Sequence, residues 1–264
     1  MLDIKQLRED PEGVKAALAR RGETPDLGAV LEIDQQRRAT LHEMEQLRAE
    51  QNRASQEIAA KKKAKEDASA AIAAMRGVSE RIKALEETTR TLDTELRAAL
   101  LGIPNLPHET APTGHGEDDN PVVRQVGTPA AFDFEAKDHV DLGTALGILD
   151  FERAAKIAGA RFTLSIGAGA LLERALTQFM LDLHTRAHGY VEVLPPFIAN
   201  VDSFTGTGQL PKFAEDQFKL AGFDYYLIPT AEVPVTNIHR DEILTADQLP
   251  IAYAAYTPCF RSEA

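Results

Sequence analysis

Three residues that follow a strand-like run could bind a small polar ligand. Thr230, Ala231 and Glu232 come directly after the run Tyr225–Pro229, which places a hydroxyl and a carboxylate at the end of a predicted strand. Together these groups can hold an ammonium group and a small polar side chain. The same Thr-x-Glu spacing can also simply begin a helix, and without further context the helix is the better explanation.

A second polar group follows another strand-like run. Phe260, Arg261, Ser262 and Glu263 come after the run Ile251–Tyr256. An arginine at the end of a strand can bind a phosphate or a carboxylate through two parallel hydrogen bonds. For an isolated Arg-x-Glu sequence, an ion pair on the surface would be the simpler explanation.

Two further patterns have weaker chemical meaning. The segment Thr205–Phe213, with the sequence TGTGQLPKF, is not a dinucleotide-binding GxGxxG loop. It predicts either a surface turn or a mobile flap over a ligand. His184 and His188 have the spacing of a helical metal pair, but Thr185 stands where a metalloprotease needs glutamate. Two histidines in the last turn of a helix also favour the helix dipole, so we predict no metal site.

The composition fits a globular protein in a reducing, cytoplasmic setting. Of the 264 residues, 44% are hydrophobic and 27% are charged, and Cys259 has no partner for a disulfide within the chain. The N-terminus lacks the apolar core of a signal peptide, and we find no run long enough to span a membrane. The net charge of −12 argues against a general nucleic-acid binder.

The charge is not evenly distributed, however. Six basic and two acidic residues fall between positions 48 and 65, a local net charge of +4. A local binding site for phosphates therefore remains open. The six basic residues are Arg48, Arg53, Lys61, Lys62, Lys63 and Lys65.

Two long helices must position this basic stretch. Asp10, Pro11 and Glu12 predict the start of an earlier short helix, and long helices follow over about residues 26–65 and 67–101. The second has a coiled-coil seam of apolar residues, whereas the seam of the first is interrupted by Asp34, Arg37, Arg48, Gln51 and Ser55. An antiparallel hairpin is expected, because neither helix could bury its stripe alone. It is either a structural or dimerising coiled coil, or an arm that grips a rod-like partner near its tip.

The sequence after the second long helix has a different pattern of predicted elements. Prolines 104 and 107 end the second long helix, and residues 108–130 resemble a linker. Helical runs at 137–149 and 169–188 then alternate with strand-like runs at 161–166, 190–194, 225–229 and 251–256. We predict an α+β fold with an antiparallel sheet, divided into domains at residues 1–110 and 111–264.

Read together and in order, these segments resemble bacterial-type seryl-tRNA synthetases, a class II family, over essentially the whole sequence. Five segments carry the resemblance: Ile103–His108 (the junction of arm and core), Gly189–Pro196 (motif 1), Thr205–Phe213 (a loop near the active site), Thr230–Pro234 (the serine-site signature) and Phe260–Glu263 (the start of motif 2). The resemblance implies a class II antiparallel sheet core flanked by helices, in a homodimer formed through motif 1 with Gly189 and Pro196.

The resemblance also implies an activity, the ATP-dependent attachment of L-serine to tRNA(Ser) through seryl-adenylate. The arm, about residues 26–101, would bind the tRNA, and tRNA(Sec) is charged in this family where it exists. Thr230, Ala231 and Glu232 would contribute to the L-serine site. Arg261, Ser262 and Glu263 would bind ATP, with Arg261 on the α-phosphate, and Mg²⁺ would be held by residues outside this sequence.

The departure from the family pattern lies at the end of the sequence, which stops within motif 2. Motif 3 and the rest of the site cannot be mapped, so we expect a truncated chain that makes no seryl-adenylate by itself. Two alternatives to an enzyme follow. One is a non-catalytic tRNA-binding fragment, and the other is a coiled-coil interaction protein with a degenerate core.

Overall fold

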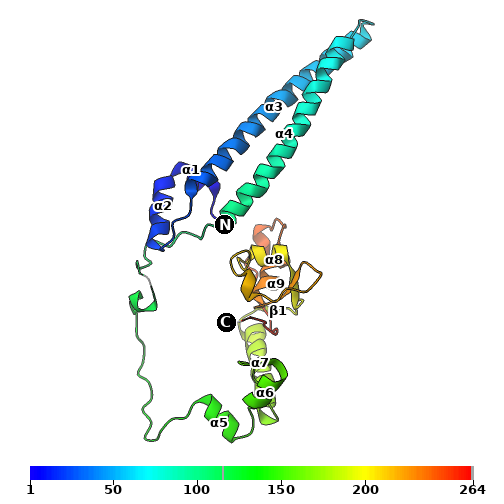
Figure 1. Cartoon of the computed structure of the whole chain (residues 1–264). Coiled ribbons are helices and arrows are strands. Elements are labelled where there is room, and N and C mark those ends of the chain that lie inside the picture. The colour runs from blue at the N-terminus through cyan, green and yellow to red at the C-terminus, as the bar shows by residue number, and fades with distance from the viewer. Residues whose placement is uncertain (115, 263–264) are drawn as a thin grey trace. The chain divides into compact units, whose positions relative to one another are not determined.

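The structure is a computed structural model that describes residues 1–114 and 116–262. The chain forms two compact units, Met1–Gln125 and Val126–Ala264 (Figure 1). The first contains the helices α1 (Ile4–Glu9), α2 (Pro11–Arg20), α3 (Leu27–Lys63) and α4 (Ser69–Leu101) and the 3₁₀ turn η1 (Glu117–Asp119).

The second unit mixes helices with short strands. Its elements are α5 (His139–Ala145), α6 (Phe151–Ala158), α7 (Ala168–Ala187), β1 (Val191–Glu192), β2 (Ile198–Asn200), α8 (Val201–Gly206), η2 (Ala214–Asp216), β3 (Tyr225–Leu227), α9 (Glu232–Thr236), η3 (Asn237–His239), η4 (Ala246–Gln248) and β4 (Tyr253–Ala254). The α+β class predicted from the sequence is confirmed.

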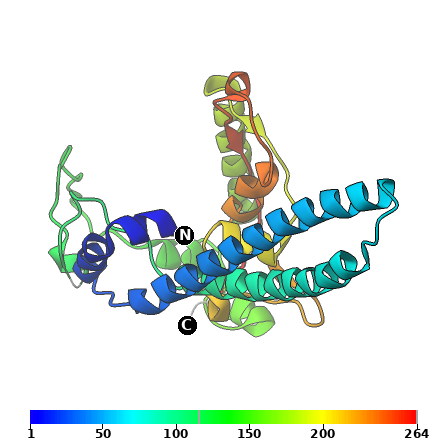
Figure 2. The same cartoon turned by 90° about the horizontal axis from the view of Figure 1, so that it is seen from above.

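The helices α3 and α4 form the predicted antiparallel hairpin and lie side by side along their length (Figures 1 and 2). They contain 37 and 33 residues. Asp26 caps the first helix, since its carboxylate accepts a hydrogen bond of 3.1 Å from the amide of Ala29. The turn between them includes Lys65, whose positive φ of 59° ends the helical path.

The interrupted seam of α3 is closed by polar pairs across the hairpin. Arg48 forms an ion pair of 2.7 Å with Glu86, and Arg37 pairs with Asp93. The amide of Gln51 donates a hydrogen bond of 3.0 Å to Ser79. These residues looked unsuitable for a seam because a coiled-coil pattern counts only apolar positions, whereas complementary polar groups can also fix the pairing of two helices.

The root of the hairpin has a hydrophobic core of its own. Leu7 and Leu18, from α1 and α2, are fully buried there against α3 and α4. Asp34 is only 2% exposed and is neutralised by Arg8 at 3.5 Å and Arg38 at 2.9 Å. The predicted start of α2 is confirmed, since the Asp10 carboxylate accepts a hydrogen bond from the amide of Gly13 and Pro11 is the first helical residue.

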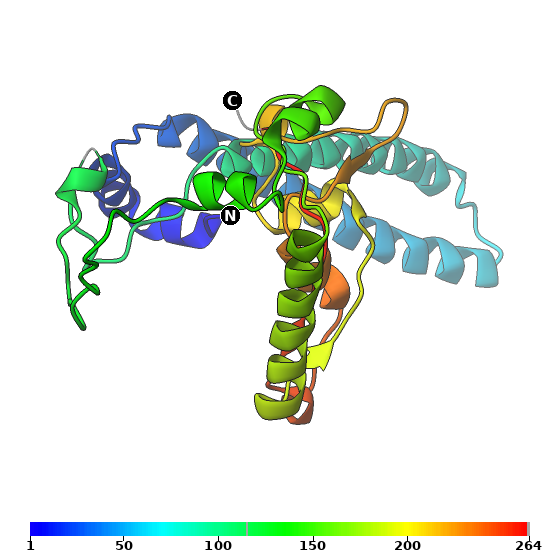
Figure 3. The same cartoon turned by 90° about the horizontal axis from the view of Figure 1, so that it is seen from below.

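The strands of the second unit are short and form two separate pairs. β2 and β3 are antiparallel, with Ala199 opposite Tyr226, whereas β1 and β4 run parallel beside α7 (Figure 3). The predicted strand at 161–166 is wrong. Arg161 has a φ of 70°, which a strand does not tolerate, and only Ser165 forms an isolated bridge, with Leu149. The segment of β2 was missed, since a three-residue strand carries too little pattern to detect.

A small core holds β2, β3, α8 and α9 together. Phe204, Ile228 and Val233 are fully buried within it, and the rings of Phe204 and Tyr226 lie 5.0 Å apart. This core fixes the point at which β3 ends and the polar residues 230–232 begin.

Candidate functional site

The segment that contains Arg261 lies against the end of β3. The amide of Phe260 donates a hydrogen bond of 2.9 Å to the carbonyl of Ile228. The next residue continues the contact, because Nε of Arg261 donates to the carbonyl of Pro229 at 3.2 Å. The predicted serine-site and phosphate-binding segments are therefore neighbours in space, since Pro229 directly precedes Thr230.

A third segment completes a hollow beside Arg261. The amide of Ser262 donates a hydrogen bond of 3.1 Å to the carbonyl of Asp216, in η2. The hollow has a volume of about 450 Å³. It is lined by Gln209, Phe213, Asp216, Gln217, Pro229, Arg261 and Ser262. Its size is within the range of pockets that hold small ligands.

The guanidinium of Arg261 is oriented by its backbone partner. Its Nε donates to the Pro229 carbonyl. Its two terminal nitrogens form no hydrogen bond or ion pair with any other residue that the structure describes. The side chain is exposed and lines the hollow. Two terminal N–H groups in one plane can donate in parallel to two oxygens of a phosphate or a carboxylate.

The residues Thr230 and Glu232 lie beside the hollow but do not line it. The helix α9 begins at Glu232, so the simpler interpretation of the Thr-x-Glu spacing, a helix start, describes the backbone correctly. The hydroxyl of Thr230 accepts a long hydrogen bond of 3.4 Å from the amide of Glu232. The Glu232 side chain is exposed and makes no ion pair with any residue that the structure describes. Glu232 therefore begins a helix and still has a carboxylate that is available to a ligand.

The segment Thr205–Phe213 is folded rather than open. Thr205 and Gly206 end α8, and the amides of Gln209 and Leu210 both donate to the carbonyl of Phe204, at 2.9 and 3.2 Å. Gln209 and Phe213 reach the hollow. The sequence pattern indicated this segment but not these two side chains in particular.

The hollow also contains residues that the sequence did not indicate. Asp216 and Gln217 belong to no motif, and only their position shows their relevance. The side-chain oxygen of Gln217 is buried and has no hydrogen-bond partner among the described residues. An unpaired buried acceptor is costly, so a ligand that donates a hydrogen bond there would be favoured. Glu263, the last of the predicted ATP-binding residues, lies outside the described residues.

The basic residues of the arm fall into two groups. Arg48 is paired with Glu86, and Lys61 forms an ion pair of 3.0 Å with Glu57. Its hydrogen bond with Glu57 raises the pKa of Lys61, which keeps that ammonium charged. The others are exposed and form no ion pair within the described part of the chain. They are Arg53, Lys62, Lys63 and Lys65.

The segment Gly189–Pro196, which resembles motif 1, follows a helix with a large exposed apolar face. Gly189 has a φ of 73° and connects α7 to β1, while Pro196 lies exposed between β1 and β2. Leu172, Phe179 and Met180 on α7 are 55%, 62% and 51% exposed. Such a surface is typical of one that is covered by another protein surface.

Neither a metal site nor a membrane span is found in the described residues. No group of three or more His, Cys, Asp or Glu side chains could hold a metal ion there. The rings of His184 and His188 contact each other, with 3.1 Å between their Nδ1 atoms. None of the helices in the described part of the chain combines the length and apolar character that a membrane-spanning segment needs.

Comparison with known families identifies both ends of the chain. Residues 1–107 match the family described as the seryl-tRNA synthetase N-terminal domain. Residues 218–264 match the tRNA synthetase class II core domain (G, H, P, S and T), and this second match includes Arg261, Thr230 and Glu232.

Curated relatives match the chain along its whole length. It is 56% identical over 265 residues to a serine–tRNA ligase of Exiguobacterium sibiricum and 57% identical over 264 residues to one of Geobacter sulfurreducens. Each alignment covers 100% of this chain and 62% of the relative, so the chain spans about 62% of the length of these proteins.

Solved structures agree with the fold. The crystal structure of seryl-tRNA synthetase from Pyrococcus horikoshii complexed with ATP matches 99% of this chain and 64% of its own, with a TM-score of 0.86 and 33% identity. The cytoplasmic serine–tRNA ligase of Naegleria fowleri in complex with AMP matches 99% of this chain and 65% of its own, with a TM-score of 0.79 and 25% identity.

Proposed function

Because this chain belongs to the seryl-tRNA synthetase family, we propose that it is part of an enzyme that attaches L-serine to tRNA(Ser) at the expense of ATP. The observation that carries the proposal is the hydrogen bond from Arg261 to the carbonyl of Pro229. This bond places Arg261, the proposed ligand of the ATP phosphate, next to Thr230, in the proposed serine site. ATP and serine could therefore bind close enough to react.

In the first step, a carboxylate oxygen of serine attacks the α-phosphorus of ATP. A new oxygen–phosphorus bond forms, the bond from the α-phosphorus to the bridging oxygen breaks, and pyrophosphate leaves with its electron pair. Negative charge develops on the α-phosphate oxygens during the attack. The terminal nitrogens of Arg261, fixed by the bond from Nε to Pro229, would stabilise this charge without reorganising.

Serine itself would lie at the start of α9. The Glu232 carboxylate can accept hydrogen bonds from the ammonium group, and the Thr230 hydroxyl and the backbone at Ala231 can contact the small side chain. Serine differs from alanine by one hydroxyl. A site that pairs this hydroxyl would reject alanine, because the buried polar groups of the site would then be left unpaired.

ATP would occupy the hollow that Arg261 and Ser262 line, and Glu263, the next residue of the sequence, would contribute to its binding. The unpaired oxygen of Gln217 would accept a hydrogen bond from a donor on the nucleotide or the amino acid. Among the described residues no group of three or more His, Cys, Asp or Glu side chains fits Mg²⁺.

The second step transfers the seryl group to the tRNA. A terminal ribose hydroxyl attacks the carbonyl carbon of seryl-adenylate, and AMP leaves. The arm of α3 and α4 would hold the long variable arm of tRNA(Ser) through the phosphates of the RNA, with Arg53, Lys62, Lys63 and Lys65 available for contact. Arg48 and Lys61 would join them by exchanging their carboxylate partners for phosphates. We extend the proposal to tRNA(Sec) where that tRNA exists.

The assembly and setting follow from the same family. The apolar face of α7, with the segment from Gly189 to Pro196, would form the homodimer interface, and the enzyme would act in the cytoplasm. Residues 1–110 would form the tRNA-binding arm, and residues 111–264 would form the part of the catalytic core that this chain contains.

The test is the exchange of labelled pyrophosphate into ATP by the complete gene product, with serine, alanine, threonine or glycine as the amino acid. The proposal expects exchange that depends on serine and is at least about a hundredfold weaker with alanine, because of the unpaired polar groups. Exchange that favours another amino acid would contradict it. We expect no exchange from the 264 residues alone, since they span only 62% of the relatives' length.

A second function is favoured by one observation. The unit Met1–Gln125 is compact and has its own buried core, so the arm could bind tRNA without catalysis. Binding of tRNA(Ser) by a complete gene product that activates no amino acid would support this alternative.

A further inference from the structure

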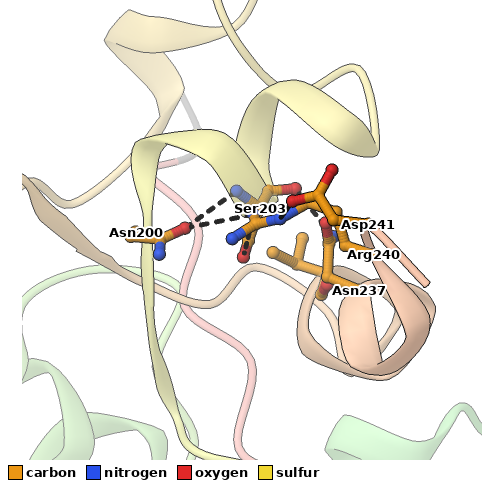
Figure 4. A network of polar contacts seen from close by, with 6 residues as sticks. Asn200, Ser203, Asn237, Arg240 and Asp241 are labelled. Atoms are coloured by element: carbon orange, nitrogen blue, oxygen red, sulfur yellow. Dashed lines mark hydrogen bonds and ion pairs between the residues drawn. The ribbon is translucent and has the colours of Figure 1, made fainter.

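The side chain of Asn237 joins two helices that lead into the candidate site. Its Nδ2 atom donates a hydrogen bond of 3.0 Å to the carbonyl of Ser203, in α8, and one of 2.8 Å to the carbonyl of Val233, in α9 (Figure 4). Ser203 is 9% exposed and Val233 is fully buried. Both protons of one partly buried amide are therefore used to connect α8 to the first turn of α9, directly after Glu232.

The carbonyl of Ser203 is shared with the loop that reaches the hollow. It accepts hydrogen bonds from the amide of Thr207 at 3.3 Å and from the hydroxyl of Thr207 at 3.1 Å. Thr207 lies between α8 and Gln209, which lines the hollow. One oxygen atom thus receives donors from both the loop and Asn237.

A second set of contacts supports this junction from the same side. Nη1 of Arg240 donates to the hydroxyl of Ser203 at 3.1 Å and lies 3.5 Å from the side-chain oxygen of Asn200 (Figure 4). That oxygen of Asn200 caps α8, accepting a hydrogen bond of 2.9 Å from the amide of Ser203. Asn237, in η3, and Arg240, the residue after η3, therefore both hold α8 in position.

Gly206, at the end of α8, lies close to the side chain of Asn237, in η3. A Cβ atom added to Gly206 would lie 2.9 Å from the side-chain oxygen of Asn237. Beneath this contact, Phe204 and Val233 are both fully buried. The segment of α9 and η3 therefore contacts α8 both through the polar side chain of Asn237 and through the buried side chains of Phe204 and Val233.

We propose that Asn237 is a positioning residue for the serine side of the site. It holds the loop 207–213 at a fixed distance from Thr230, Ala231 and Glu232. The inference rests on the proposed function, in which these three residues contact L-serine. Arg261 is held separately, through the carbonyl of Pro229, so its guanidinium does not depend on Asn237, whereas Gln209 and Phe213 of the loop also line the hollow.

The first test measures hydrogen exchange in this 264-residue chain and needs no activity. Asn237→Ala removes both donors, and Thr236→Ala is the matched control, since Thr236 is an exposed neighbour on α9. We expect the amides of Thr207, Gln209 and Leu210 to exchange about tenfold faster in Asn237→Ala and at the wild-type rate in the control. The amide of Phe260, bonded to Ile228, should keep its rate in both.

The second test separates positioning from general destabilisation in the complete gene product. Asn237→Ala should raise KM for serine about tenfold and KM for ATP less, by about threefold at most, because Arg261 keeps its bond to Pro229 while Gln209 and Phe213 move with the loop. Gly206→Ala, which pushes on the same contact from the other helix, should shift the two constants in the same unequal way. If Asn237→Ala does not fold, Gly206→Ala provides the same comparison of the two KM values.

The outcomes decide between the alternatives. Faster exchange at Phe260 as well as in the loop, or equal changes in both KM values, would show a merely structural role and overturn the inference. Wild-type rates in the loop of Asn237→Ala would also overturn it. If the wild-type gene product activates no serine while the loop amides respond as expected, the proposed function fails but the link between Asn237 and the loop stands.

Discussion

At the scale of single residues, the structure adds mainly the orientation of side chains whose type already suggests a binding role. An arginine after a strand can bind an anion, and the sequence showed this possibility beside the simpler one of a surface ion pair. The bond from its Nε to the Pro229 carbonyl was not readable, because it depends on how residues 260–262 lie along the end of β3. Gln217 gave no signal at all, since only a folded chain shows which amide oxygen is buried and unpaired.

The unpaired oxygen of Gln217 leads to a prediction about ligand binding. Gln217→Leu should lower kcat/KM for serine-dependent exchange by the complete gene product about tenfold, because a hydrogen bond to the bound ligand is lost. The free energy of unfolding should not fall, since the variant also removes a buried acceptor without a partner. Steady-state kinetics and urea unfolding provide the two measurements.

The control for this variant is Gln56→Leu, at an exposed glutamine on α3. It should change neither kcat/KM nor the unfolding midpoint. Wild-type kinetics for Gln217→Leu would remove Gln217 from the site.

At the scale of elements, the long helices and their pairing in a hairpin were predictable, but the side-chain contacts that join them were not. Caps such as Asp10 and Asp26 and long stretches without proline set the helix limits, which are local properties. The pairing of Arg48 with Glu86 joins residues 38 positions apart, so the seam of α3 looked incomplete until both helices were seen together. The short strands were the hardest elements, because two or three residues form no readable alternation.

The tip of the arm leads to a prediction about RNA binding. Changing Lys62, Lys63 and Lys65 to glutamine in the complete gene product should weaken its binding of tRNA(Ser). The slope of log affinity against log salt concentration should flatten by about two units, because fewer counterions are released from the RNA. Filter binding or fluorescence anisotropy at several salt concentrations measures this slope.

The control removes equal charge from elsewhere on the same hairpin. Lys83, Arg90 and Arg97 are exposed on α4, nearer the root, and their change to glutamine alters the net charge by the same amount. Equal losses of affinity in both triple variants would indicate a general charge effect and not a binding tip.

At the scale of the whole molecule, the change of texture along the sequence predicted two parts, and the chain forms two compact units. The sequence did not indicate that α7 in particular would expose a large apolar surface. A helix with leucine, phenylalanine and methionine on several sides normally lies inside a core, yet Phe179 is 62% exposed here. Burial depends on everything that surrounds a helix, which its own sequence does not contain.

The exposed face of α7 leads to a prediction about assembly. Phe179→Glu should convert a dimeric complete gene product into a monomer at micromolar concentration, because a charge replaces a side chain whose burial contributes about 2 kcal/mol. Sedimentation velocity measures the change, with Gln178→Glu on the same helix as the control. A Phe179→Glu variant that remains as dimeric as the control would place the interface elsewhere.

The most direct test of the account concerns Arg261, where the three segments of the site meet. In the complete gene product, Arg261→Ala should lower the rate of serine-dependent exchange of pyrophosphate into ATP about a hundredfold or more, as expected for a lost stabiliser of transition-state charge. Arg124→Ala, at an exposed arginine outside the site, should retain the wild-type rate. Equal rates for Arg261→Ala and the wild type would contradict the proposed site.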